Sequence, residues 1–473
     1  MTANQPEPLP TPAEMGEADR NSAAMGHPGL ALMRAAATAV ARAARRFGPC
    51  RTLVLCGSGN NGGDGWAAAR LLAQDGWPVA AAEWAPPRPG SDAAAMRAAW
   101  RGPVVPFTPA EAARAHLVID AVFGAGLRDD VPAAVADVLA AAPRVLAVDV
   151  PSGLDGATGQ GRGRVRSADA TITFAARKPG HLLLPGRALC GPVLLAAIGL
   201  PPAALPAVRT WRNTPALWAD QLLPLDAAAH KYTRGHLAVL GGATMTGAAR
   251  LAAEAGRRGG AGLVTIAAQG AGNLYRGGAP GLIVSDAPLH DLMADDRLGA
   301  WVCGPGLEGE VARQALPVLV RHGRRVVADA GALTAFAGQP DGLKGTAVIT
   351  PHAGEFAKLF GPIENDKLAA ARAAAARLGL VVVMKGADTV VADPDGRAAI
   401  NDNAPPWLAT AGAGDVLAGL VGANLAQGME PWQAACAAVH RHGEAAALAG
   451  PGMIAEDLLE ALHSLARTPN SAL

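Results

Sequence analysis

Cysteine is scarce in this sequence and follows no pattern that would give it a structural role. The cysteines are scattered, odd in number, and never form a C-x-x-C pair. Such a set argues against a disulfide framework and against a structural zinc site. We therefore expect a protein of a reducing compartment and assign it to the cytoplasm.

Long hydrophobic runs and basic clusters are also missing. No apolar run reaches about 18 residues, the length that a membrane-spanning helix needs. The first residues, MTANQPEPLPTPAEMGEADR, lack the basic and then apolar order of a signal peptide. The net charge is +1, and no basic stripe carries interleaved aromatic residues. We therefore expect neither a membrane nor a nucleic acid as a partner. Lysine is rare and occurs only at Lys178, Lys231, Lys344, Lys358, Lys367 and Lys385.

The length of the chain and the alternation of its segments predict two domains. A chain of 473 residues, half of them apolar, is long for one hydrophobic core. After a helix expected over residues 12–47, short apolar runs ending in glycine alternate with Ala-rich segments, beginning with RTLVLCG and a helix expected over residues 66–74. This alternation is typical of a parallel sheet covered on both faces. Residues 201–229, rich in Pro, are interpreted as a seam before a second series that begins at GHLAVLGG.

The segment Cys56–Leu72, CGSGNNGGDGWAAARLL, concentrates glycine and amide side chains between a strand and a helix. Its glycines satisfy G-x-G-x-x-G, which by itself indicates a dinucleotide-binding turn or a turn that serves geometry alone. Asp64 would repel a phosphate at the start of the helix. The amide oxygens of Asn60 and Asn61 suit a hard cation or a ligand's hydroxyl and amide groups. The turn therefore favours a mixed polar ligand and is compatible with a monovalent ion.

Two further strand ends supply oxygen atoms. DAVFGAGLRDD places Asp120 at one strand end before a Gly-rich loop, and VDVPSGLDG places Asp149 and Ser152 at the next. Ligands of open parallel sheets bind outside the carboxyl ends of the strands. We therefore expect the three segments to converge on one crevice.

These segments, with TFAARKPGHLLLPGR, resemble the signature segments of NAD(P)H-hydrate epimerases over roughly residues 12–205. The resemblance implies an NAD(P)H-hydrate epimerase domain with a Rossmann-like fold over residues 1–210. It implies that Asp149 is catalytic and that Asn61, Asp120 and Ser152 hold a potassium ion. The residues that it implies contact the hydrated cofactor are Asn60, Asn61, Gly62, Gly63, Asp64, Gly124, Ala125, Gly126, Leu127, Arg128, Asp129, Asp130 and Asp149.

The richest stretch of the C-terminal half is LATAGAGDVLAGL. Its small residues open a helix, so their backbone N–H groups form an anion hole for a transferring phosphoryl group. Asp415 could take a proton from a substrate hydroxyl, or it could serve only as a helix N-cap. No G-x-x-x-x-G-K-[ST] occurs, which excludes a P-loop NTPase.

With HKYTRGHLAVLGG, GPGL, TPHAGEF and KGADT, this stretch resembles the ADP-dependent NAD(P)H-hydrate dehydratases, whose fold is ribokinase-like. The resemblance implies such a domain over residues 211–473, and magnesium bound with ADP. It implies that Asp415 is catalytic, that Ala248, Gly306, His352 and Asp415 contact the hydrate, and that Lys385, Gly386, Ala387, Asp388, Thr389 and Gly414 contact ADP. Two positions depart from the family pattern: Gly331 replaces the second Asp of D-A-D-A-L, and Ala413 replaces the Thr of G-T-G-D.

The sequence therefore predicts an α/β protein of two three-layer α/β/α domains, the first Rossmann-like and the second ribokinase-like. The predicted function is repair of hydrated nicotinamide cofactors. The first domain would interconvert the R and S epimers of NADHX and NADPHX, and the second would dehydrate the S epimer with ADP. One alternative is a ribokinase-like small-molecule kinase with a non-catalytic N-terminal module; another is a Rossmann dehydrogenase. A homo-oligomer is compatible with all of these functions.

Overall fold

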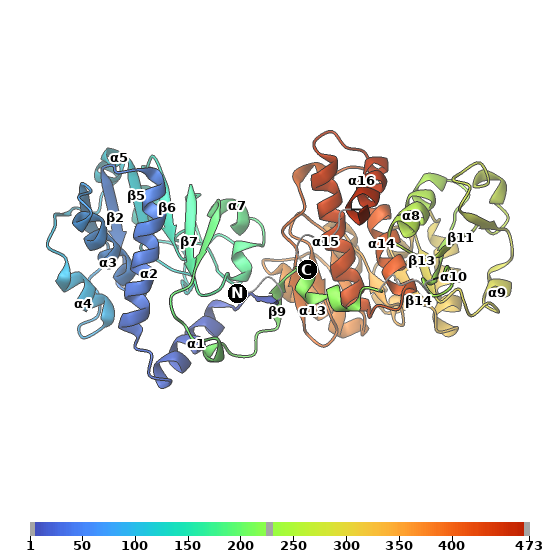
Figure 1. Cartoon of the computed structure of the whole chain (residues 1–473), viewed down its shortest axis with the longest axis horizontal. Helices are drawn as coiled ribbons and strands as arrows, with labels where there is room; N and C mark the ends of the chain where they lie inside the picture. The colour runs from blue at the N-terminus through green and yellow to red at the C-terminus, as the bar shows by residue number, and fades with distance from the viewer. Residues whose placement is uncertain (1–4, 224–229, 468–473) are drawn as a thin grey trace. The chain divides into compact units, whose positions relative to one another are not determined.

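The computed structural model describes residues 5–223 and 230–467. Residues 8–210 form one compact unit, and the described residues from Trp211 onward, with Glu7, form the other. Each unit contains one sheet with helices packed against it (Figure 1). The expected α/β class with two domains is thus confirmed. Of the segment interpreted as a seam, residues 224–229 lie outside the described residues. Within the described ranges, no helix is both long and apolar enough to cross a membrane.

The N-terminal unit has a seven-stranded sheet in the order β4-β3-β2-β5-β6-β7-β8, and every neighbouring pair is parallel. Its strands are β2 (Thr52–Cys56), β3 (Val79–Glu83), β4 (Val104–Val105), β5 (Leu117–Ala121), β6 (Val145–Val148), β7 (Ala170–Phe174) and β8 (Val193–Ala196). Its α-helices are α1 (Pro12–Ala24), α2 (Gly29–Ala44), α3 (Asn60–Gln74), α4 (Asp92–Ala99), α5 (Pro109–Arg114), α6 (Ala133–Ala140) and α7 (Gly186–Cys190).

Helices cover both faces of this sheet, as the alternation of residues along β2 shows. Leu53 and Leu55 pack in the cluster that contains Val135 of α6. Val54 and Cys56 pack in the cluster that contains Trp66 of α3. Because successive side chains of a strand point to opposite faces, a strand with apolar side chains on both faces requires an apolar layer on each side.

Parallel register brings three strand ends to one edge of the sheet. Cys56 pairs with Ala121, and Asp120 pairs with Ala147. The segments that follow β2, β5 and β6 therefore leave the sheet side by side. The expected convergence of these segments follows directly from this register.

Two expected helices differ from the structure. The helix expected over residues 12–47 is two helices, because Gly26 has a positive φ of 87° and Pro28 precedes α2. The helix expected to begin at Trp66 begins at Asn60, so the sequence NNGGDG forms its first turns. Glycine is a poor helix former, but here its lack of a side chain allows close packing: a Cβ at Gly62 would lie 1.9 Å from the Gly57 carbonyl oxygen.

The C-terminal unit's helices pack on a sheet ordered β1-β9-β18-β17-β16-β15-β14-β13-β10-β11-β12. Its strands are β1 (Glu7–Pro8), β9 (Thr210–Arg212), β10 (His236–Leu240), β11 (Leu263–Ala267), β12 (Ile283–Ser285), β13 (Ala300–Cys303), β14 (Arg325–Ala328), β15 (Val348–Ile349), β16 (Val381–Met384), β17 (Val390–Ala392) and β18 (Ala398–Ile400). Its α-helices are α8 (Thr246–Arg258), α9 (Leu289–Leu292), α10 (Gly309–Arg321), α11 (Gly331–Ala335), α12 (Ala353–Phe360), α13 (Lys367–Leu378), α14 (Ala413–Ala426), α15 (Pro431–Ala449) and α16 (Ala455–Arg467).

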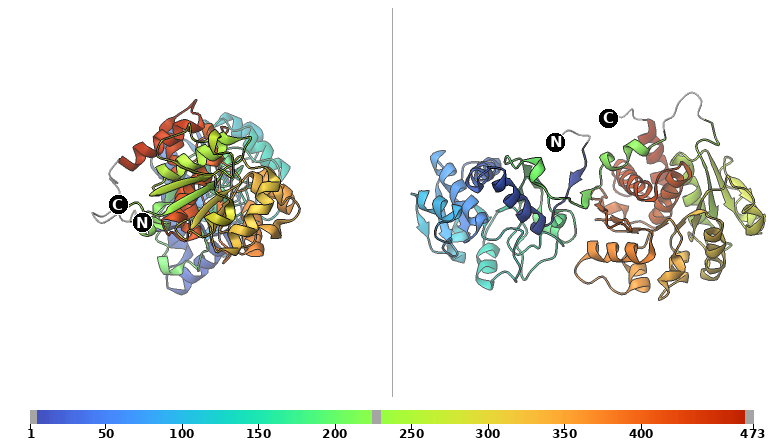
Figure 2. Two further views of the ribbon diagram at one scale, coloured as in Figure 1. Left: turned by 90° about the vertical axis from the view of Figure 1, so that its right-hand side faces the viewer. Right: turned by 90° about the horizontal axis from the view of Figure 1, so that it is seen from below.

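This sheet is only partly parallel. The pairs from β12 to β16 are parallel, whereas β16, β17 and β18 pair antiparallel. The segment LVVVMKGADTVVADPDG, expected within a βα series, thus contains two strands, β16 and β17, joined by Lys385–Thr389. In the left view of Figure 2, strands of this sheet lie between the red helices near the C-terminus and the orange helices opposite them.

Candidate active sites

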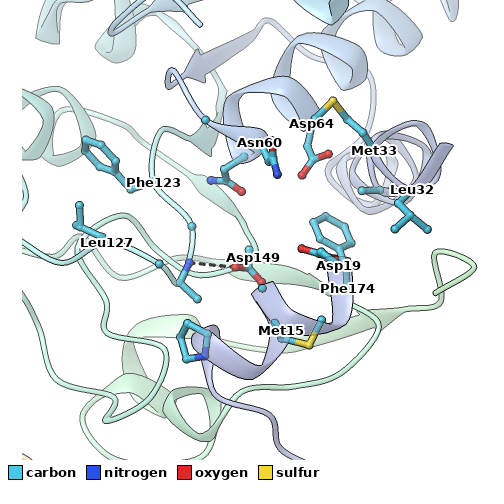
Figure 3. Close-up of a pocket in the computed structure, with 18 of the residues that line it drawn as sticks. Met15, Asp19, Leu32, Met33, Asn60, Asp64, Phe123, Leu127, Asp149 and Phe174 are labelled. Atoms are coloured by element: carbon cyan, nitrogen blue, oxygen red, sulfur yellow. Dashed lines mark hydrogen bonds between the residues drawn. The ribbon is translucent and has the colours of Figure 1, made fainter. Parts of the chain in front are cut away.

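A pocket of about 600 Å³ lies at the edge of the N-terminal sheet where β2, β5 and β6 end (Figure 3). Helices α1, α2 and α3 supply part of its wall, and the loop after β5 supplies another part. Nine residues predicted from the sequence line it: Asn60, Asn61, Asp64, Gly124, Ala125, Gly126, Leu127, Arg128 and Asp149. The structure therefore brings the NNGGDG turn, the Gly-rich loop and Asp149 together.

Four other residues predicted to contact the ligand do not line this pocket: Gly62, Gly63, Asp129 and Asp130. Gly62 faces the Gly57 backbone, and a Cβ at Gly63 would lie 2.7 Å from the Met33 side chain, so both glycines permit close packing behind the pocket wall. Asp129 and Asp130 are exposed and are not among the lining residues.

Asp149 is held in one orientation by four neighbouring groups. Its Oδ1 accepts hydrogen bonds from Lys178 Nζ at 2.6 Å and from Thr173 Oγ1 at 3.0 Å, and its Oδ2 accepts one from the Ala125 N–H at 3.0 Å. The His181 ring contacts the Asp149 carbonyl oxygen at 2.8 Å. Asp149 has a φ of 68°, a conformation that a non-glycine residue keeps only when its surroundings impose it. The site is therefore rigid at this residue.

Lys178 determines the charge state of Asp149. Burial by itself raises the pKa of Asp149, but the Lys178 ammonium and its hydrogen bond outweigh burial and lower the pKa to about 2. The Lys178 side chain is only 5% exposed, so water screens the pair weakly. Burial also lowers the pKa of His181, and the neighbouring Lys178 charge adds to this, giving about 4. At neutral pH this cluster therefore contains an ionised Asp149 and a neutral His181 beside Lys178.

A second carboxyl group faces the same pocket. Asp64 lies in the second turn of α3, and burial raises its pKa well above the ordinary value. The nearby carboxylates of Asp149 and Asp19 raise the pKa of Asp64 further. Figure 3 shows Asp19, Asp64 and Asp149 directed into the same space. The pocket thus combines an ionised carboxylate with a carboxyl group that favours its protonated form.

The residues predicted to hold potassium lie behind the Gly-rich loop. Asp120 accepts hydrogen bonds from Ser152 Oγ at 2.6 Å and from the Ser152 N–H at 2.8 Å, and Ser152 Oγ accepts one from the Phe123 N–H at 2.9 Å. Burial raises the pKa of Asp120 although these hydrogen bonds oppose it. The Asn61 Nδ2 atom is buried with no hydrogen-bond partner among the described residues. Asp120 and Ser152 are therefore in direct contact, and Asn61 lies beside the Gly-rich loop, since a Cβ at Gly124 would be 3.6 Å from Asn61 Oδ1.

Four residues of this site were not predicted from the sequence: Asp19 and Lys178, which line the pocket, and Thr173 and His181, which support Asp149. Asp19 comes from α1, which also supplies Pro12, Met15 and Gly16 to the lining and precedes the segments that carry the motifs. For Lys178 a signal existed: it is one of six lysines in an Arg-rich chain and follows a predicted strand.

In the C-terminal unit, charged residues from three segments meet near the start of α14. Lys385 Nζ lies 2.8 Å from Asp329 Oδ1 and 3.7 Å from Glu355 Oε2. A Cβ at Gly414 would lie 3.5 Å from Lys385 Nζ. Burial lowers the pKa of Lys385, but Asp329 and Glu355 outweigh it, so its pKa is raised. Asp329 and Glu355 were not among the predicted ligand contacts.

Asp415 is the third residue of α14 and does not cap it. The N-cap is Gly412, with a φ of 83° and no side-chain cap hydrogen bond. Burial raises the pKa of Asp415 to about 6; Asp329 adds to the shift and Lys385 opposes it. A carboxylate with this pKa is largely ionised at neutral pH yet still basic enough to accept a proton.

The remaining predicted residues of this unit fall into three groups. Gly306 and Ala248 are neighbours, since a Cβ at Gly306 would lie 3.3 Å from the Ala248 Cβ. His352 is the N-cap of α12: its Nδ1 accepts the Gly354 N–H at 3.0 Å.

The third group is the loop Lys385–Thr389, in which two side chains stabilise the loop itself. Thr389 Oγ1 donates to the Gly386 carbonyl at 2.7 Å, and the Asp388 carboxylate pairs with Lys367 at 2.6 Å. Gly386 and Ala387 leave their part of the loop without a bulky side chain.

Steric crowding in the structure accounts for one departure from the family pattern, the glycine at position 331. A Cβ at Gly331 would lie 2.2 Å from the Leu307 carbonyl oxygen, so this backbone accepts no side chain there. Ala413, the other departure, is buried at the first position of α14, and its N–H donates to the Thr410 carbonyl oxygen at 3.4 Å.

No group of three or more His, Cys, Asp or Glu side chains within the described residues is arranged to hold a metal.

Comparison with known proteins finds a matching family model for each unit. Residues 29–180 match the family model described as YjeF-related protein N-terminus, and residues 237–464 match that described as NAD(P)H-hydrate dehydratase. A solved ADP/ATP-dependent NAD(P)H-hydrate dehydratase from Bacillus subtilis is 30% identical with a TM-score of 0.45, covering 52% of this chain and 94% of its own.

Curated relatives match across both units. The bifunctional NAD(P)H-hydrate repair enzyme of Escherichia coli is 36% identical, over 87% of this chain and 84% of its own length. That of Moorella thermoacetica is 35% identical, over 97% and 96%. That of Mycobacterium tuberculosis H37Rv is 38% identical, over 86% and 87%. The chain therefore belongs to the family of bifunctional NAD(P)H-hydrate repair enzymes.

Proposed function

We infer that this chain repairs hydrated nicotinamide cofactors. The N-terminal unit interconverts the R and S epimers of NADHX and NADPHX, and the C-terminal unit dehydrates the S epimer at the expense of ADP, giving AMP and phosphate. The observation that carries this proposal is that each unit gathers titratable side chains near the ends of parallel strands, within segments matched by the two family models.

In the N-terminal unit, the epimerising centre is the pocket around Asp149. The hydrate carries a hydroxyl on C6 next to the ring nitrogen, so epimerisation must break and remake a bond at C6. In this proposal Asp149 accepts the hydroxyl proton; its contact with Lys178, which keeps it ionised, supports that role. The NNGGDG turn and the loop 124–128 contact the rest of the hydrate.

In the C-terminal unit, Asp415 takes the proton of the C6 hydroxyl as the β-phosphoryl group of ADP is transferred to it. The Gly412–Gly414 amides at the start of α14 stabilise the charge that develops on that group. Ala248, Gly306 and His352 contact the hydrate, while Lys385–Thr389 and Gly414 contact ADP. Phosphate then leaves C6 and a proton leaves C5, which restores the reduced cofactor. Magnesium, held with the ADP phosphates near Asp329 and Glu355, would supply electrostatic stabilisation.

The decisive experiment is incubation of the chain with mixed NADHX epimers and ADP. Recovery of the reduced-nicotinamide absorbance from both epimers is expected. Recovery that stops when the S epimer is consumed would refute the epimerase assignment. Accumulation of a stable phosphorylated product, with no absorbance recovered, would instead indicate a small-molecule kinase.

Potassium is proposed for the epimerase unit, with Asn61, Asp120 and Ser152 as its ligands. A cation there would offset the charge of the buried Asp120 and stabilise the Gly-rich loop through Ser152, which bonds to Phe123.

Replacing Asp120 by alanine is expected to raise the KM for NADHX and to abolish any dependence of the epimerase on potassium. Initial rates in potassium chloride and in choline chloride of equal ionic strength provide the measurement, and S-epimer dehydration by the same protein is the control for intact folding. A wild-type epimerase that runs equally well in choline chloride would contradict the proposed ion.

A further inference from the structure

Among the described carboxyl groups that line the pocket, Asp64 is the buried one, whereas Asp19 is exposed and Asp92 and Asp149 are partly exposed. Asp64 is 8% exposed and lines the pocket, and it is directed into the space that it shares with Asp149 (Figure 3). Asp149 has three hydrogen-bond donors on its carboxylate. For Asp64, burial and like charges account for the raised pKa, and no hydrogen bond contributes to the shift. The Asp64 carboxyl therefore has no role in holding the fold together that would explain its burial.

The charges around Asp64 favour its protonated form. Asp149 faces it from the end of β6 and Asp19 from α1. Asp92 of α4 and Arg128 of the loop after β5 also line the pocket, and the Lys178 charge is engaged by Asp149. Burial beside two other carboxyl groups, with no cation paired to it, raises the pKa of Asp64 and so favours its protonated form. The pocket thus holds one carboxyl group as an acid and another as a base, the arrangement by which enzymes assign opposite roles to two carboxyl groups.

We propose that Asp64 is the proton donor of the epimerisation, acting with Asp149 as the base. This assignment rests on the proposed epimerase function and adds a second catalytic residue to it.

The step that this pair supports is opening of the hydrated ring. Asp149 accepts the proton of the C6 hydroxyl, the C6–O bond becomes a carbonyl double bond, and the C6–N1 bond breaks. Asp64 gives its proton to N1, which receives the electron pair of the broken bond. Rotation about C5–C6 turns the other face of the aldehyde to N1. Closure then reverses each transfer: N1 returns its proton to Asp64 and Asp149 returns its proton to oxygen. Both residues recover their initial states, and no other reactant is required.

Asp64→Asn tests this assignment, because asparagine keeps the shape of the side chain and cannot transfer the proton. We expect the epimerase kcat to fall by about 10²–10⁴, as for loss of a positioned general acid, while KM changes less than threefold. The wild-type kcat should also decline as pH rises through the pKa of Asp64, since the acid form is then lost. That decline should be absent from the residual rate of Asp64→Asn.

Three controls separate this role from the alternatives. Asp75→Asn, at the other end of α3 in an exposed pair with Arg45, should leave the epimerase unchanged. Asp19→Asn should retain the pH-dependent decline; if it removes the decline and Asp64→Asn does not, Asp19 is the donor and the proposal is overturned.

Stability is the third control. Because the folded state raises the pKa of Asp64, ionisation of this group costs stability as pH rises above the ordinary value. Asp64→Asn should therefore melt no lower than wild type at pH 8 and should keep S-epimer dehydration. A kcat within twofold of wild type in a folded Asp64→Asn protein would overturn the proposal. A wild-type chain without epimerase activity would instead overturn the proposed function.

Discussion

Replacing Asp149 by asparagine is expected to reduce epimerisation of NADHX by at least about 10², because a positioned proton-transfer group contributes about 10²–10⁴-fold to a rate. The same protein should dehydrate the S epimer at the wild-type rate, since that chemistry is assigned to residues 211–473. The measurement is the slow recovery of absorbance from the R epimer alone, compared with rapid recovery from the S epimer. Equal loss of both activities would contradict the assignment of one reaction to each unit.

This substitution also removes the partner of a buried lysine, so its effect on stability needs its own control. Breaking a buried ion pair on one side costs about 3–5 kcal/mol, mostly from the charge left unpaired. The double variant Asp149→Asn, Lys178→Met removes both charges and should regain stability while remaining inactive as an epimerase. Because the folded state lowers the pKa of Asp149 to about 2, the stability that its ionised form contributes is present above the ordinary pKa near 3.8. It should be lost as pH falls toward 2.

Replacing Asp415 by asparagine is expected to reduce S-epimer dehydration by about 10²–10⁴. The C6 hydroxyl is a poor nucleophile until a base accepts its proton, and Asp415 lies at the start of α14 beside Lys385. Affinity for ADP should change little, because Lys385–Thr389 and the backbone amides remain. Single-turnover rates and ADP binding on the same protein provide the measurement. The wild-type rate should rise as pH increases through about 6, where the carboxylate forms, and level off above it.

Asp457 offers a matched control for this prediction. It is also the third residue of a helix, α16, but its Oδ2 accepts the Ile454 N–H at 2.8 Å and so closes the helix start. Asp457→Asn should therefore cost up to about 1 kcal/mol of stability and leave turnover unchanged. Asp415→Asn should show the reverse pattern: burial and Asp329 already disfavour its charged form, so stability at pH 8 should not fall. A destabilised but active Asp415→Asn protein would mean that this residue only stabilises the helix.

Local pattern was sufficient to predict most of the strands and the segments of both sites. The runs at β2, β5 and β6 are apolar except at Thr52 and Asp120, because both faces of a parallel sheet are buried, and Gly57, Gly124 and Asp149 lie at or shortly after their ends. Parallel register then requires their ends to meet. Hence Asn60, Asp64, Gly124 and Asp149 were expected in one crevice, and the structure places them in one pocket.

Tertiary packing determined two features that the local sequence pattern did not predict: the start of α3 and the hairpin of β16 and β17. The sequence NNGGDG is a poor helix former by propensity, yet it begins α3, because its glycines let the helix pack against the Gly57 carbonyl and Ala121. The sequence did not reveal that β16 and β17 form a hairpin. The connection between them is short and has no periodicity of its own, so the two strands could not be told apart from one apolar stretch.

By itself, the sequence determined a two-domain α/β protein, since strand periodicity and glycine turns are local properties, and its motifs resemble those of the NAD(P)H-hydrate repair family. Only the tertiary structure decided the protonation states on which the chemistry depends. Lys178 lies 29 residues from Asp149 in sequence and Nζ is 2.6 Å from its Oδ1 in space. Asp19 reaches the same pocket from α1, while Asp329 and Lys385 meet near Asp415 from separate strand ends. A pKa depends on burial and on charges within a few ångströms, and both of these are set by the fold.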